Sequence, residues 1–115
     1  MQNDRQTEPP AILCPVVPSD LDRLHDKADE ASRLLAVLGQ SKRLIVLCRL
    51  IDGEMSVGAL AEAVGLSQSA LSQHLARLRH LGIVATRRDG QTIHYRLVSE
   101  DVKRLIAVLQ EIYCR

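Results

Sequence analysis

The sequence contains no phenylalanine and no tryptophan, and only two of its 115 residues are tyrosine. Hydrophobic residues nevertheless make up 46% of the chain, so its core must be built from aliphatic side chains. A chain of this length is expected to form one domain with a modest core, and small cores often gain burial by dimerisation. The composition therefore predicts a single folded domain that associates with a second copy of itself.

Long apolar runs are also missing from the sequence. No run approaches the roughly 18 residues that a membrane-spanning helix needs. The N-terminal region lacks the basic and then apolar pattern of a secretory signal peptide. We therefore expect a cytoplasmic protein that does not associate with a membrane.

Cysteine is scarce, and its spacing argues against two common uses. The three cysteines form no Cys-x-x-Cys pair, and an odd number of them does not suit a disulfide framework. They are Cys14, Cys48 and Cys114. Each of the three therefore needs its own explanation.

Neither sign of charge dominates the whole chain, but the charge is unevenly distributed. The formal net charge is +1, which argues against a nonspecific coat on nucleic acid. Between Ser67 and Arg96, five arginines accompany a single aspartate, an excess of four positive charges. A nearly neutral protein with one basic region is typical of a site-specific DNA-binding protein.

The chain divides into a predicted tail and one predicted folded domain. Residues 1–18 contain all four prolines and many polar residues, so we predict a flexible tail there. In residues 19–115, the folded domain, apolar periodicity first predicts four successive helices, each with a serine at its expected N-cap. These helices begin at Ser19, Ser41, Ser56 and Ser67 and end before Gly39, Asp52, Gly65 and Gly82.

A hairpin and a fifth helix complete the predicted pattern. The extended runs 83–88 and 91–97 flank Asp89-Gly90, a strong signal for a two-residue turn. Ser99 is expected to cap the last helix, whose apolar stripe a small domain could not cover alone. This stripe and the helix that starts at Ser19 form a candidate dimer surface. The order α-α-α-α-β-β-α is that of a winged helix-turn-helix, mainly α with a β-hairpin wing, here expected as a homodimer.

The helix between Ser67 and Gly82 has two unlike faces. Four leucines recur at helical spacing and are expected to point into the core: Leu71, Leu75, Leu78 and Leu81. The other face carries short hydrogen-bonding side chains and a cation, which suit base edges and phosphates in a DNA groove. The residues expected to contact DNA are Gln68, Ser69, Ser72, Gln73, His74 and Arg77, joined by Arg87 and Arg88 of the hairpin.

These residues also have plainer explanations. The polar face could simply be solvated, and His74 borders the apolar face, where it could hydrogen-bond within the fold. Arg87 and Arg88 could be exposed charges that protect a strand edge. The short bracing helix before this helix and the basic hairpin after it favour DNA contact.

The segments just described resemble those of the ArsR family of prokaryotic repressors. The similarity is carried by residues 67–79 and by Leu81-Gly82-Ile83-Val84, with further likeness in Lys42-Arg43-Leu44 and in residues 57–61, and it covers about residues 19–114. It implies a homodimer that binds operator DNA, expected to be an inverted repeat, and releases that DNA when an inducer arrives.

Many members of this family sense a metal, and the resemblance shows where the ligands would lie. Ser56 and Gly58 stand where those members carry a pair of thiolates, and the last helix contains no histidine. Soft-metal sites need three or four converging thiolate or imidazole ligands. We therefore expect no metal and no cofactor.

The two cysteines of the folded domain instead resemble those of the persulfide-sensing branch, the SqrR and BigR type. The similarity lies in Leu47-Cys48-Arg49-Leu50 and Ile112-Tyr113-Cys114. It implies that Cys48 and Cys114 are bridged by sulfur when reactive sulfur species or low-molecular-weight persulfides accumulate, and that bridging releases the DNA. Cys14, in the tail, has no comparable counterpart.

Other interpretations of the cysteines remain open. Cys48 lies on an apolar stripe, where free cysteine is often a buried core residue, so the protein could be a DNA-binding dimer with structural thiols. The same cysteines could serve a repressor that senses general oxidants or electrophiles. In a different class, Cys48 and Cys114 could hand sulfur between them in a thiol sulfurtransferase, but no acid–base constellation supports an enzyme.

Overall fold

A computed structural model describes residues 18–114 of the chain. Residues 1–17, with Cys14 and most of the predicted tail, lie outside this range. The elements are α1 (Pro18–Asp26), α2 (Ala28–Leu38), α3 (Ser41–Leu50), β1 (Met55–Ser56), α4 (Val57–Val64), α5 (Gln68–His80), β2 (Val84–Asp89), β3 (Thr92–Leu97) and α6 (Glu100–Tyr113). None of the helices within this range is long and apolar enough to cross a membrane.

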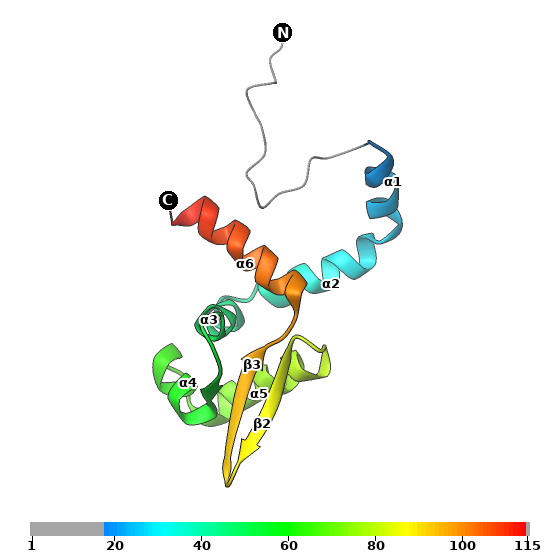
Figure 1. Ribbon diagram of the computed structural model, residues 1–115. Coiled ribbons are helices and arrows are strands. Elements are labelled where there is room, and N and C mark those ends of the chain that lie inside the picture. Colours follow the sequence, from blue (N-terminus) through cyan, green and yellow to red (C-terminus); the bar gives the residue numbers. More distant parts are fainter. Residues whose placement is uncertain (1–17, 115) are drawn as a thin grey trace.

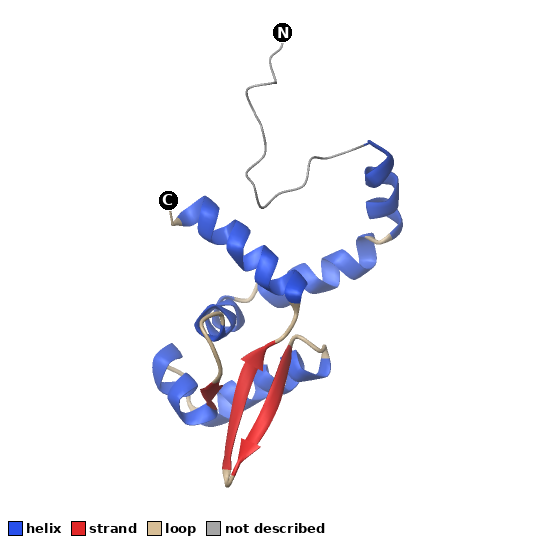
Figure 2. Ribbon diagram, viewed as in Figure 1, coloured by secondary structure: helices blue, strands red, loops and turns tan. Residues whose placement is uncertain are grey.

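The helices and the hairpin form two regions joined by α3 (Figure 1). Helices α3, α4 and α5 pack beside the β2–β3 hairpin, whereas α2 and α6 lie at the other end, away from the hairpin tip (Figure 2). The predicted winged helix-turn-helix, mainly helical with an antiparallel hairpin, is confirmed.

The core is aliphatic, as the absence of phenylalanine and tryptophan predicts. Every buried side chain in the described part of the chain belongs to valine, leucine, isoleucine or alanine, and Tyr95 packs only partly buried against them. Five leucines from three helices are less than 2% exposed and form the centre: Leu47, Leu60, Leu71, Leu75 and Leu78. The helix-turn-helix is therefore held by packing of α3, α4 and α5 against one another.

The first predicted helix is wrong as a single element, because the chain breaks it at Lys27. There the backbone leaves helical geometry, with ψ of 12°, between α1 and α2. Every side chain from Asp20 to Glu30 is exposed, so no packing against the rest of residues 18–114 holds the two segments in line. Helix α1 also begins at Pro18, so Ser19 lies inside it rather than before it.

Most other predicted helix starts are confirmed. The hydroxyls of Ser56, Ser67 and Ser99 each accept a hydrogen bond from a backbone N–H three residues later. The prediction for Ser41 is wrong, because the side chain of Gln40 accepts the hydrogen bond from the Arg43 N–H at 2.9 Å and caps α3 instead.

The sheet contains one strand more than the sequence predicts. The short strand β1 pairs antiparallel with β3, which in turn pairs with β2. The hairpin turn is shifted by one residue, since Asp89 pairs with Thr92 and the turn is Gly90-Gln91. Gly90 has a positive φ of 64°, which a residue without Cβ adopts at little cost.

Candidate DNA interface and thiol site

The polar side of α5 is turned outward because its apolar side is fixed in the core. Leu71, Leu75 and Leu78 have no exposed surface, so the helix cannot rotate about its axis. The N-cap Ser67 and the turn at Gly65 fix its start, where Gly65 has a left-handed φ of 72°. Helices α4 and α5 therefore pack against each other as a helix-turn-helix.

The predicted DNA-contacting residues of α5 lie together on its outer surface. Five of them are exposed, namely Gln68, Ser69, Ser72, Gln73 and Arg77. His74 is half-buried at the edge of the apolar face, so its side chain is only partly available to a ligand. The surface presents several hydrogen-bond donors and acceptors with one guanidinium, which suits contact with a DNA groove.

The prediction that Leu81 points into the core is wrong. Its side chain is 47% exposed, because α5 ends at His80 and the chain turns there. Gly82 has a positive φ of 75°, and the following residue, Ile83, is only 4% exposed. Ile83, and not Leu81, is therefore the core residue that follows α5.

The two arginines of the hairpin differ in their partners. Arg88 is exposed and makes no ion pair with any residue between 18 and 114. Arg87 forms a bidentate ion pair with Glu54, which immediately precedes β1; its Nε donates to both carboxylate oxygens at 3.1 and 3.3 Å, and its terminal nitrogen also donates to Oε1. Arg88 is thus open to a phosphate, whereas Arg87 is tied to the body of the domain.

The sequence does not predict a role for Glu54. This residue and Arg87 are 33 positions apart, and no local pattern signals their pairing. The hydrogen bond from Arg87 lowers the pKa of Glu54, and the positive charges of Arg87, His94 and Arg96 lower it further. Glu54 is therefore ionised at neutral pH and is paired with Arg87 on the wing.

Both cysteines of the folded domain are free thiols with exposed side chains. Cys48 lies near the end of α3 and Cys114 follows the end of α6. Partial burial raises the pKa of the Cys48 thiol, and the nearby Cys114 thiolate raises this pKa further. The charge of Cys114 therefore acts on Cys48, although the two residues are far apart in the sequence.

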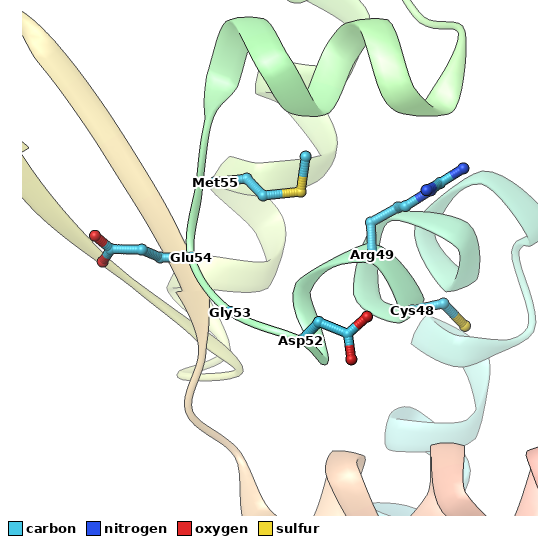
Figure 3. Close-up of a pocket in the computed structure, with 6 residues that line it drawn as sticks. All are labelled: Cys48, Arg49, Asp52, Gly53, Glu54 and Met55. Carbon is cyan, nitrogen blue, oxygen red and sulfur yellow. The ribbon is translucent and has the colours of Figure 1, made fainter.

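Cys48 does not belong to the core, although its position on an apolar stripe allowed that interpretation. The buried residues of α3 are Val46, Leu47 and Leu50, and Cys48 lies beside them. Its side chain lines a surface cavity with the segment that follows α3 (Figure 3). No group of three or more histidine, cysteine, aspartate or glutamate side chains in the described range is placed to hold a metal ion.

An apolar groove lies at the end of the molecule away from the wing. It is lined by residues of α2, α3 and α6, among them Leu35, Leu105, Leu109 and Tyr113. Two of these side chains are largely exposed, Leu35 at 57% and Tyr113 at 79%. This groove lies on the surface that the sequence predicts for dimerisation.

Residues 40–86, from the cap of α3 into β2, match the model of the family described as bacterial regulatory protein, arsR family. The transcriptional activator HlyU of Vibrio cholerae is 45% identical over 98 residues, which cover 85% of this chain and 91% of HlyU. The chain belongs to the ArsR family. It is a DNA-binding transcriptional regulator with the winged helix-turn-helix fold.

Solved structures of the family share this arrangement. The repressor BigR of Xylella fastidiosa superposes with a TM-score of 0.77 at 38% identity, over 87% of this chain and 99% of BigR. A domain from Mycobacterium bovis described as homodimeric, a possible ArsR-family regulator, superposes with a TM-score of 0.67 at 36% identity, over 79% of this chain and 84% of that domain. The family therefore includes proteins named as activators and as repressors, and at least one homodimer.

Proposed function

We propose that this protein is a cytoplasmic, sulfide- and persulfide-responsive repressor that binds operator DNA while Cys48 and Cys114 are reduced. The protein releases the operator when sulfur bridges these two cysteines. The proposal is supported by two free, exposed thiols at the ends of α3 and α6 of a DNA-binding fold, where the charge of Cys114 raises the pKa of Cys48. A pair of thiols near each other can be linked by sulfur chemistry without a metal or a cofactor.

DNA binding is assigned to α5 and the wing. Helix α5 enters the major groove, where Gln68, Ser69, Ser72 and Gln73 contact base edges and Arg77 contacts a phosphate. His74 contributes from the edge of this surface, and Arg88 contacts the backbone from the wing. Arg87, by contrast, reaches a phosphate only if its ion pair with Glu54 opens.

The protein is proposed to act as a homodimer that is joined through α2 and α6. Each protomer leaves an apolar groove and the exposed leucines of α1 and α2 uncovered. A second copy can cover this surface by twofold symmetry. Two symmetric recognition helices then require an operator that is an inverted repeat, with half-sites about 34 Å apart.

The proposed bridge forms from low-molecular-weight persulfides without a separate oxidant. Each cysteine thiolate attacks the outer sulfur of a persulfide RS–SH, and a thiolate RS⁻ leaves, so each cysteine becomes a persulfide. One of these, as Cys–S–S⁻, then attacks the inner sulfur of the other and displaces HS⁻. The product is a trisulfide, in which one sulfur atom lies between the two cysteine sulfurs.

The bridge affects DNA binding because it links the helix-turn-helix to the proposed dimer surface. Helix α3 packs on α4 of the helix-turn-helix, and α6 lies on the proposed dimer surface. A covalent link between them shifts the recognition helices relative to the dimer axis. Their spacing then no longer matches the two half-sites of the operator.

Intact-mass analysis tests the chemistry. We expect glutathione persulfide to add a bridge that contains at least one inserted sulfur atom, and peroxide to produce far less of any bridged form. Cys48→Ser and Cys114→Ser proteins should remain unbridged. Equal formation of an ordinary disulfide with both reagents would instead support a general oxidant sensor, and rapid sulfur transfer to added thiols without DNA binding would support a sulfurtransferase.

A further inference from the structure

The segment between α3 and β1 joins the thiol site to the wing. Cys48 and Glu54 line one cavity together with Arg49, Asp52, Gly53 and Met55. Figure 3 shows Cys48 and Glu54 pointing away from each other, with Glu54 directed toward the strands of the hairpin. Only five residues of the chain therefore lie between the thiol of Cys48 and the carboxylate of Glu54, which holds the wing.

The beginning of this segment is hydrogen-bonded to the backbone of Cys48 and Leu50 in the last turn of α3. The Cys48 carbonyl accepts a hydrogen bond from the Ile51 N–H at 3.3 Å, and the Leu50 carbonyl accepts one from the Gly53 N–H at 3.3 Å. Displacement of Cys48 therefore displaces the turn that leads to Glu54.

The end of the segment is attached to both DNA-binding parts. Glu54 holds Arg87 of β2 through charge-assisted, bidentate hydrogen bonds, which have a more defined geometry than a single ion pair. The next residue, Met55, pairs with Tyr95 of β3, and Ser56 caps α4. A movement of Glu54 therefore also moves the wing and the start of the helix-turn-helix.

We propose that Glu54 is a positioning residue that fixes the wing through Arg87 and transmits the state of Cys48 to the DNA-binding surface. This inference rests on the proposed function, because the signal starts with sulfur bridging at Cys48. In the reduced protein, the ion pair orders the wing for DNA. After bridging, the last turn of α3 is pulled toward the end of α6, and Glu54 carries Arg87 and β2 away from the DNA.

The test compares Glu54→Gln with Asp52→Asn as a matched control. Both variants remove one negative charge from the same segment, but Asp52 forms no ion pair with residues 18–114. The DNA is a duplex selected from a random pool by the reduced wild-type protein, and the reagent is glutathione persulfide. The measured quantity is the ratio of the dissociation constants of the treated and reduced proteins.

We expect the wild type and Asp52→Asn to give the same ratio, and Glu54→Gln to give a ratio about two- to fivefold smaller. Arg87→Lys should behave like Glu54→Gln, because an ammonium group cannot form the bidentate contact. A wild-type ratio retained in Glu54→Gln would overturn the inference while the proposed function stands. A ratio of one in the wild type would overturn both.

Hydrogen exchange in the reduced protein gives a readout that depends on neither DNA nor persulfide. Backbone amides of β2 and β3 should exchange faster in Glu54→Gln than in Asp52→Asn, because only the first variant loosens the wing. Equal exchange in the two variants would show that Glu54 does not position the wing.

Discussion

The acidity of Cys48 depends on a residue far away in the sequence. Burial raises the pKa of its thiol first, and the charge of Cys114 raises it further. Because only the thiolate reacts with iodoacetamide, we predict that alkylation of Cys48 accelerates at a pH above the usual thiol pKa of about 8.5. In Cys114→Ser the midpoint should move down, toward that usual value, because one of the two causes is gone.

Peptide mass spectrometry of samples quenched across a pH series measures this midpoint. Cys48 should remain somewhat less acidic than an ordinary thiol in Cys114→Ser, since burial is unchanged. Identical pH profiles in the wild type and in Cys114→Ser would contradict the proximity of the two thiols.

Gln73 and Arg77 lie about one turn apart on α5 but should contribute differently to DNA binding. Arg77→Gln should weaken binding to all sequences alike and reduce the salt dependence by about one phosphate contact. Gln73→Ala should cost about 1–3 kcal/mol on the preferred base pair and little on other sequences. Competition binding at several salt concentrations separates the two, and a uniform loss for both variants would contradict base contact by Gln73.

At the scale of single residues, the sequence predicts which side chains of a helix are buried better than it predicts which distant residues they contact. The sequence indicates which side chains of α5 face outward, because the leucines Leu71, Leu75 and Leu78 define the buried side. It does not indicate that Glu54 holds Arg87 or that Cys48 is exposed beside the core. Both facts depend on how α3 and the segment after it pack against the hairpin, which no local periodicity encodes.

Among the elements, the turn between α4 and α5 offers the clearest test of local energetics. Gly65 has a φ of 72°, and its N–H and that of Leu66 both bond to the Ala61 carbonyl. A Cβ at this position would meet no atom within 4 Å, so the cost of Gly65→Ala is conformational alone. We predict a loss of about 1 kcal/mol in the free energy of unfolding.

Urea denaturation followed by circular dichroism measures this loss. Gly65→Asn should cost less than Gly65→Ala, because asparagine tolerates the left-handed region better. Equal stability of the wild type and the alanine variant would contradict the left-handed geometry of the turn.

The bounds of helices and strands were predictable where they depend on interactions between residues close in the sequence, and less predictable elsewhere. The serine caps of α4, α5 and α6 and the approximate position of the hairpin follow from spacing of a few residues. The break at Lys27 and the strand β1 do not follow from such spacing. In the first case no packing among the described residues holds the segment straight, and in the second the two-residue strand exists only because β3 lies beside it.

On the scale of the whole molecule, the apolar groove between α2, α3 and α6 predicts dimerisation. Leu35 is 57% exposed and lines this groove, so Leu35→Glu should leave the protomer folded but place a charge in the interface. Because burying an unpaired charge is costly, the variant should be largely monomeric. Ala59→Glu introduces the same charge at an exposed position on α4, remote from the groove, and should remain dimeric.

Sedimentation equilibrium gives the mass of each species, and circular dichroism verifies that the variants are folded. A Leu35→Glu protein that stays dimeric at the wild-type concentration dependence would exclude this groove as the interface. The fold of one protomer could be predicted from the sequence, whereas the extent of the proposed dimer surface is given by the apolar side chains that the protomer leaves exposed.

Sulfur bridging of Cys48 and Cys114 is proposed to release DNA. Titration of one selected duplex with the reduced and the persulfide-treated protein, alongside Cys48→Ser and Cys114→Ser, measures this release. We predict that treatment weakens wild-type binding about 5–150-fold, the usual range of allosteric coupling, and leaves both variants unchanged. Unchanged affinity of a wild-type protein that mass analysis shows to be bridged, or normal release by either serine variant, would contradict the account.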